Sequence, residues 1–195
     1  MKLHPWNTDF TWTTPRGPFR RVTPEQARHF DEHGFVVLDD VFSDARVAEV
    51  RDEIDVFDGF VRDFLRKQPD ERMMIAEAGA ITFNTHLVPQ SAVARRFASD
   101  PVFVDLCADL LGPDVDLYWD QGVYKHPEKP RRFPWHQDNG YTFIEPQQYL
   151  TCWVALTDCI ASMRVTCRSA SSRRAIPPTA ACPQIRSNAS SPQCR

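Results

Sequence analysis

The sequence contains no apolar run near the length of about 18 residues that a membrane helix requires. Residues 1–16 hold charged and aromatic side chains where a secretion signal has an apolar core. The chain also has no excess of positive charge, because its formal net charge is −3 at neutral pH. Nucleic-acid binding needs a clustered basic surface. We therefore expect a cytoplasmic protein that binds neither membranes nor nucleic acids.

The last part of the chain lacks most of what a folded domain is built from. Residues 159–195 contain no Asp, Glu, Lys, Gly, Leu, Phe, Tyr or Trp, but hold seven serines and six arginines. All 26 acidic residues and 17 of the 23 basic ones lie in 1–158, so the formal net charge is −9 there and +6 in 159–195. We predict one ordered domain over 1–158 and an aberrant, disordered tail over 159–195.

The abruptness of this change suggests its origin. A sudden loss of glycine, acidic residues and large apolar residues, with Arg, Ser, Ala, Pro and Cys taking over, is typical of GC-rich DNA translated in a shifted frame. Our hypothesis is a frameshifted or truncated copy. Four of the six cysteines lie in this tail, while Cys107 and Cys152 lie in apolar runs and are expected to be reduced core cysteines.

Helical patterns come first along the chain. The capping box Thr23-Pro24-Glu25-Gln26 predicts a helix that ends at Gly34. A second helix is predicted after Ser43, and a third between Asp100-Pro101 and Gly112-Pro113. The second carries an apolar stripe for packing on a sheet, formed by Val47, Val50, Ile54, Phe57, Val61 and Phe64.

Strand patterns dominate afterwards. Strands are expected at 35–38, 81–86, 115–125, 133–138 and 149–157, the last because Leu150, Cys152, Val154 and Leu156 alternate with other residues. Asn84 and His86 either border an active site or belong to an ordinary edge strand. Helices followed by antiparallel strands indicate an α+β fold, a helix-buttressed β-sandwich or jelly roll.

The strongest chemical signal is Pro134-Trp135-His136-Gln137-Asp138. His136 and Asp138 are two apart on a predicted strand, so both side chains project to the same face. An imidazole and a carboxylate, joined by a second histidine, form the facial triad that holds Fe(II) and leaves positions open for a 2-oxo acid and dioxygen. A His-x-Asp pair alone is more often a plain hydrogen-bonded pair than a metal site.

The surroundings of this motif carry a wider similarity. From residue 23 to 158 the chain resembles the phytanoyl-CoA dioxygenase family. The features that carry the resemblance are, in chain order, the segment 33–38, Leu111-Gly112-Pro113, the strand with Gln121 and Lys125, the segment 135–138 and the segment 150–156.

The resemblance implies a double-stranded β-helix, a cupin-like jelly roll, here incomplete at its C-terminus. It implies that His136 and Asp138 bind Fe(II), that 2-oxoglutarate and O₂ are co-substrates, and that a small organic molecule is hydroxylated. It further implies that Trp153 and Gln121 contact the co-substrate.

The chain also departs from the family pattern. The family has a distal histidine as the third iron ligand and, about ten residues later, an arginine for 2-oxoglutarate, but no histidine follows His136 here. Two alternatives therefore remain. One is a non-catalytic remnant or binding module on the same scaffold. The other is a zinc hydrolase that uses His136, Asp138 and His126.

Overall fold

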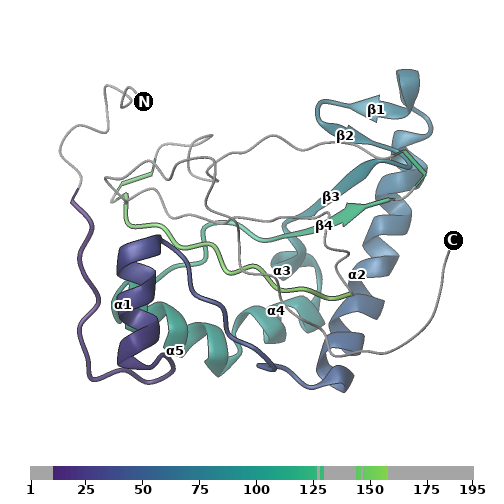
Figure 1. Ribbon diagram of the computed structural model, residues 1–195. Helices are drawn as coiled ribbons and strands as arrows, with labels where there is room; N and C mark the ends of the chain where they lie inside the picture. Colours follow the sequence, from purple (N-terminus) through teal and green to yellow (C-terminus); the bar gives the residue numbers. More distant parts are fainter. Residues whose placement is uncertain (1–10, 127, 130–143, 146, 158–195) are drawn as a thin grey trace, which may run out of the picture.

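The computed structural model describes residues 11–126, 128–129, 144–145 and 147–157, and the structural statements below concern these residues. Helices and a small antiparallel sheet make up this part of the chain (Figure 1). The elements are α1 (Pro24–His33), α2 (Asp44–Leu65), the 3-10 turn η1 (Pro69–Glu71), β1 (Arg72–Met73), β2 (Ala76–Glu77), β3 (Ile81–Thr85), α3 (Leu87–Gln90), α4 (Ala92–Ala98), α5 (Pro101–Leu110) and β4 (Gln121–Lys125).

The first helix forms as its sequence predicts. The hydroxyl of Thr23 accepts a hydrogen bond from the backbone N–H of Gln26, and the Gln26 side chain accepts one from the backbone N–H of Thr23. At the other end Gly34 adopts the left-handed conformation, at φ 79°, that closes a helix. The capping box and the glycine therefore fix both ends of α1.

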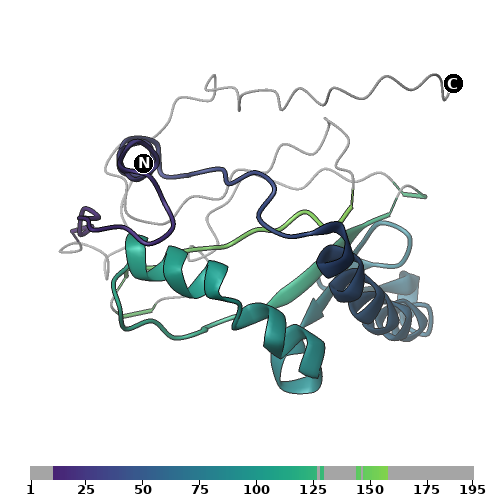
Figure 2. The same ribbon diagram turned by 90° about the horizontal axis from the view of Figure 1, so that it is seen from below.

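The sheet has the order β1-β2-β3-β4, with all neighbours antiparallel. Strands β3 and β4 pair over their full length, from Ile81 opposite Lys125 to Thr85 opposite Gln121. Helix α2 lies along one face of this pair (Figures 1 and 2). The prediction that the second helix packs on a sheet is confirmed.

The buried stripe of α2 differs from the predicted one at Asp58 and at the C-terminal end of the helix. Val50, Ile54 and Leu65 are buried, but Phe64 is 46% exposed and the carboxylate of Asp58 is buried in the row instead. Asp58 follows Ile54 by four residues and therefore shares its face. A charge can occupy this position because β3 supplies a polar partner for it, as described below.

Two apolar cores hold the helices, and one segment joins them. The first core combines α1 and α5 around Phe30 and Leu110, and the second lies between α2, α3 and α4 around Val50 and Leu87. Residues 147–157 run between the two cores without pairing into the sheet (Figure 1). Leu150 packs on the first core and Leu156 on the second, so this segment, hereafter the strap, ties them together.

A buried carboxylate fastens the chain ahead of α1 to α5. Asp109, which is 7% exposed, accepts hydrogen bonds from the backbone N–H groups of Arg20, Arg21 and Val22 at 2.8, 2.7 and 3.0 Å. Three donors satisfy one carboxylate and offset the cost of its burial. Asp109 therefore holds residues 20–22 against α5, in addition to the apolar core that α1 and α5 share.

The strand predictions have mixed outcomes. The strand at 81–86 is confirmed as β3, and 115–125 is confirmed only at its end, as β4. Residues 35–38 and 149–157 were predicted as strands but are not strands in the structure, where Val36, Leu150 and Leu156 pack on the helical cores. Helices α3 and α4 were not predicted, and β3 precedes α5.

The fold class is confirmed as mixed α+β, whereas the jelly roll stays a prediction. The predicted strand at 133–138 and the predicted tail at 159–195 lie outside the described residues. Cys107 is half-buried, but Cys152 is exposed, so the prediction of a core position is wrong for Cys152. In the part of the chain described here, no helix is both long and apolar enough to cross a bilayer.

Candidate functional site

The register of β3 and β4 separates two faces with different chemistry. Residues directly opposite in an antiparallel pair project to the same side of the sheet. Thr82 opposite Tyr124 and Asn84 opposite Gly122 therefore share the face covered by α2. The other face carries Ile81, Phe83 and Thr85 of β3 and Gln121, Val123 and Lys125 of β4. We call it the open face, because the three β4 side chains are exposed on it, although Ile81 is buried.

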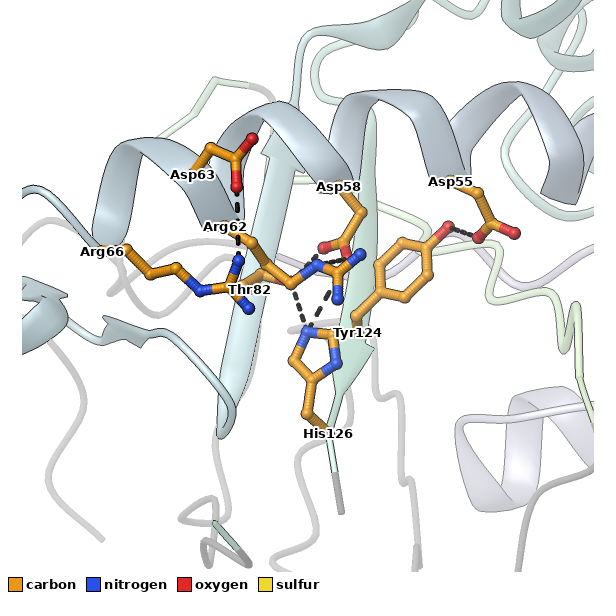
Figure 3. Close-up of polar contacts among 8 residues, drawn as sticks. All are labelled: Asp55, Asp58, Arg62, Asp63, Arg66, Thr82, Tyr124 and His126. Atoms are coloured by element: carbon orange, nitrogen blue, oxygen red, sulfur yellow. Dashed lines mark hydrogen bonds and ion pairs between the residues drawn. The ribbon is translucent and has the colours of Figure 1, made fainter. Parts of the chain in front are cut away.

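Under α2 lies a buried polar network (Figure 3). The hydroxyl of Thr82, which is fully buried, donates a hydrogen bond to the carboxylate of Asp58. The Nε of Arg62 lies 2.9 Å from the other oxygen of Asp58. The Nε2 of His126 lies 3.1 Å from the Thr82 hydroxyl oxygen and 3.8 Å from the Asp58 carboxylate. The network joins α2 to β3 and to the residue that follows β4.

The network also assigns a proton to His126. Since the Thr82 hydroxyl donates to Asp58, its oxygen accepts from His126, and the Nε2 of His126 therefore carries hydrogen. The ring of His126 therefore takes part in the contact between α2 and the sheet. The zinc-hydrolase alternative stays a prediction, because its other two ligands, His136 and Asp138, lie outside the described residues.

A second polar contact lies one turn back along α2. The phenol of Tyr124 donates a hydrogen bond of 2.6 Å to the carboxylate of Asp55 (Figure 3). Partial burial of the ring, followed by the hydrogen bond and the negative charge of Asp55, raises the pKa of Tyr124 well above its ordinary value. The phenol therefore stays neutral and keeps donating to α2.

A pocket of about 250 Å³ lies beside this network. It is lined by Arg62, Arg66, Glu71, Ala78, Gly79, His126, Glu128 and Lys129. Its cations have carboxylate neighbours, since Arg62 pairs with Asp58, Arg66 with Asp63 at 3.3 Å, and Lys129 with Glu71 at 3.1 Å. The charges compensate one another, so the pocket is not an anion-binding site.

The open face carries the first predicted co-substrate residue, Gln121. Its side-chain oxygen accepts a hydrogen bond of 3.2 Å from the indole nitrogen of Trp119. The ring of Trp119 lies 4.4 Å, centroid to centroid, from that of His86, which follows β3. Because the indole can only donate, this bond directs the carboxamide oxygen of Gln121 toward Trp119 and leaves its NH₂ group as a donor for a ligand.

The second predicted co-substrate residue, Trp153, lies on the strap. Leu150 and Leu156 of this segment contact the helical cores. Trp153 is 50% exposed and is not among the residues that pack on either core. Both predicted co-substrate residues thus lie on surfaces that the helices leave uncovered.

Asn84 does not share that side. Its side chain is 3% exposed under α2, and neither its oxygen nor its nitrogen has a hydrogen-bond partner among the described residues. Position 84 lies opposite Gly122, the glycine against which Ile54 of α2 packs. The alternative in which Asn84 borders an active site stays a prediction, and its side chain lies on the face of β3 that α2 covers.

The predicted iron ligands His136 and Asp138 lie outside the described residues. Within the described ranges, no three His, Cys, Asp or Glu side chains are grouped closely enough to hold a metal ion. The chemistry of the predicted donors, one imidazole and one carboxylate, fits two of the three protein positions of an Fe(II) facial triad. Both residues belong to the segment 130–143, which comes after β4 in the sequence.

Sequence reasoning missed the network under α2. The available signal was Asp58, a carboxylate at an apolar position of the α2 stripe. A charge at such a position predicts a buried partner. The partners themselves could not be identified, because Thr82 and His126 are far away in sequence.

Comparisons with known proteins agree on one family. The model of the phytanoyl-CoA dioxygenase family matches residues 30–162. An ectoine dioxygenase of Sphingopyxis alaskensis is 29% identical over 117 residues, which cover 60% of this chain and 37% of that protein. An ectoine dioxygenase of Bordetella parapertussis is 25% identical over 143 residues, 70% of this chain and 45% of that protein. The chain thus spans less than half of these relatives, and no solved structure matches it.

Proposed function

The chain belongs to the phytanoyl-CoA dioxygenase family, and from this we propose that it is part of an Fe(II)- and 2-oxoglutarate-dependent dioxygenase that hydroxylates a small organic molecule. The proposal includes the double-stranded β-helix as the complete fold. It assigns His136 and Asp138 to the iron, and Gln121 and Trp153 to 2-oxoglutarate. The supporting observation is that Gln121 lies on the open face of the sheet, away from α2.

When bound, Fe(II) with 2-oxoglutarate and O₂ supplies the oxidative chemistry, in which the oxo acid is decarboxylated to succinate and the substrate gains a hydroxyl group. The described side chains serve to position the oxo acid. The NH₂ group of Gln121 donates a hydrogen bond to a carboxylate, while its oxygen is held by Trp119. The exposed ring of Trp153 contributes an apolar wall that excludes water.

The relatives suggest where to look for a substrate. Both are ectoine dioxygenases, so ectoine is the first compound to test, followed by small polar molecules of similar size and charge. The site for such a molecule would share the open face with the oxo acid. Enclosed pockets of a few hundred Å³ are usual for ligands of this size.

A second candidate is a scaffold that retains binding without turnover. This candidate applies if the iron has only the two protein ligands that residues 1–195 assign to it, His136 and Asp138. Such a protein would bind Fe(II) and 2-oxoglutarate weakly and form no succinate. The two candidates share the site and differ in the reaction.

One experiment separates these outcomes. Under anoxic conditions 2-oxoglutarate is titrated into the protein with and without Fe(II), and succinate is then measured after O₂ and ectoine are added. Binding that requires Fe(II), together with succinate formation, supports the dioxygenase, and binding without succinate supports the scaffold. His136→Ala should abolish the iron-dependent binding, whereas His29→Ala, on the surface of α1, should not. The proposal is overturned if 2-oxoglutarate does not bind, or if His136→Ala binds it unchanged.

A further inference from the structure

Two histidines lie one turn apart on α1. His29 is half-buried and His33 is exposed. Residues four positions apart share one face of a helix, and the two imidazole rings are stacked, with their centroids 4.2 Å apart and their planes 15° apart. Two nitrogens that bind the same ion, each at about 2.0–2.1 Å, lie at most about 4 Å from each other. The rings are therefore close enough for one metal ion to reach both.

The hydrogen bonding of His33 leaves a ligand nitrogen free. Its Nδ1 lies 3.1 Å from the backbone oxygen of His29. Because a carbonyl oxygen only accepts, Nδ1 carries the hydrogen, and the Nε2 of the neutral ring keeps its lone pair. Histidines that bind metals usually donate their other ring N–H in this way, often to a backbone carbonyl. The ring nitrogens of His29 have no hydrogen-bond partner among the described residues.

The ring of Phe35 packs against both imidazoles. It meets His29 edge-on, with 4.9 Å between the ring centroids, and lies 6.4 Å from the ring of His33. Side chains that are already confined lose less conformational entropy when a ligand orders them. The pair is therefore partly preorganised to bind an ion.

The charges around the pair favour a cation. His33 is the last residue of α1, where the aligned peptide dipoles place partial negative charge. The exposed carboxylates of Asp31 and Glu32 lie in the same turn, and neither forms an ion pair in the part of the chain that the structure describes. A cation bound by His33 would offset the repulsion between these negative charges.

We propose that His29 and His33 form a binding site for a divalent ion of the late first-row metals, such as Ni²⁺, Cu²⁺ or Zn²⁺. Imidazole suits these ions, whereas Mg²⁺ and Ca²⁺ take oxygen ligands. Fe²⁺ comes before Ni²⁺ and Cu²⁺ in the general order of affinity, so the pair should bind Fe²⁺ more weakly than either. Water completes the coordination, because no third His, Cys, Asp or Glu is grouped with the two histidines within the described ranges.

Binding would join the last two turns of α1. Because the two nitrogens come together only in the helix, the ion should bind the folded chain more tightly than the unfolded one and stabilise it. This inference is independent of the proposed function, since it uses neither His136 nor Asp138.

The test uses the full chain without a histidine tag and with His136→Ala, so that the proposed iron site is removed. Isothermal titration should detect binding of Ni²⁺, and Ni²⁺ should raise the midpoint of thermal unfolding. Adding His33→Ala should weaken Ni²⁺ binding about tenfold or more and abolish the rise of the midpoint, because a single imidazole remains. Adding His86→Ala, which removes the histidine after β3, should leave the affinity for Ni²⁺ unchanged.

Two variants with an unchanged number of histidines test the spacing. Glu32→His combined with His33→Ala places the histidines three positions apart, on one face of α1, and should retain most of the affinity. Asp31→His combined with His33→Ala places them two positions apart, on different faces, and should bind Ni²⁺ as weakly as His33→Ala alone. Circular dichroism reports whether each variant is folded. Unchanged affinity in folded His33→Ala, or equal affinity at spacings of two and four, would overturn the proposal.

Discussion

The hydroxyl of Thr82 on β3 donates a hydrogen bond to the carboxylate of Asp58 on α2, in a region that excludes solvent from both side chains. The same hydroxyl oxygen accepts from His126. The Thr82 hydroxyl therefore provides a hydrogen-bond partner both for the carboxylate of Asp58 and for the Nε2 of His126. The stability of the contact between helix and sheet should depend on it.

Thr82→Val keeps the shape of the side chain and removes both hydrogen bonds. A buried carboxylate that loses a donor costs about 1–3 kcal/mol, so the free energy of unfolding should fall by that amount. Urea unfolding followed by circular dichroism measures the change. Thr85→Val, on the open face of the same strand, is the control and should change stability by less than about 0.5 kcal/mol. Equal losses in the two variants would contradict the assigned network.

Gly122 should not tolerate a side chain. A Cβ at this position would lie 2.8 Å from the Cγ2 of Ile54. Gly122→Ala should therefore destabilise the protein by about 1–3 kcal/mol, as overpacked cores do. Ile54→Leu removes Cγ2, so the double variant should recover part of the loss, with a coupling of about 0.5–3 kcal/mol.

Gly59 on α2 provides the matched comparison for that substitution. No atom lies within 4 Å of a Cβ built there. Gly59→Ala should raise the free energy of unfolding by about 0.5–1 kcal/mol, because alanine favours a helix over glycine. Thermal unfolding of the two single variants should shift in opposite directions. A shift in the same direction would mean that Gly122 is not in close contact with α2.

Tyr124 should make stability decrease at alkaline pH. Its pKa is raised in the folded protein, so the folded state favours the neutral phenol. The resulting stabilisation is complete below the ordinary tyrosine pKa of about 10 and is lost as the pH rises toward the folded value. Chemical unfolding measured between pH 8 and 11 should show this loss in the wild type and a smaller one in Tyr124→Phe. Phenolate absorbance of Asp55→Asn should show one tyrosine ionising earlier than in the wild type.

Asp109 should protect the segment before α1 from cleavage by trypsin. Asp109→Asn removes the charge that binds three backbone N–H groups, at a cost of roughly 1.5–3 kcal/mol for hydrogen bonds to a charged group. Because that segment opens more often, trypsin should cleave after Arg20 or Arg21 about tenfold faster or more. Asp105→Asn breaks only the exposed pair with Arg20, at 3.6 Å, and should leave the rate nearly unchanged. Equal rates in the two variants would mean that Asp109 does not hold the segment.

Local signals were enough to predict α1, α2 and α5, but not the short helices α3 and α4. The capping residues Thr23, Ser43 and Asp100 all act as caps, because each side chain bonds to a backbone N–H two or three positions ahead. Strands were harder to predict than helices, because a strand forms only when it pairs with another strand that can lie far away in sequence. Residues 35–38 have the composition of a strand, yet Val36 packs on the first helical core.

In the candidate site too, residues could be chosen from local sequence patterns, but their placement depended on contacts between distant parts of the chain. His136 and Asp138 could be selected from their spacing, and their role stays a prediction. Gln121 and Trp153 followed from a resemblance, and their placement on uncovered surfaces required the register of β3 and β4 and the packing of the strap. The burial of Asp58 could not be predicted, because its partner Thr82 lies 24 positions away and approaches it only when α2 folds onto the sheet.

The close approach at Gly122 restricts which residues can stand at two positions together. With only a hydrogen atom on the strand side, the backbone of β4 leaves room for the Cγ2 of Ile54. A larger residue at position 122 therefore requires a smaller or differently shaped one at position 54. In the sequence β4 leads on to residues 130–143, which contain His136 and Asp138.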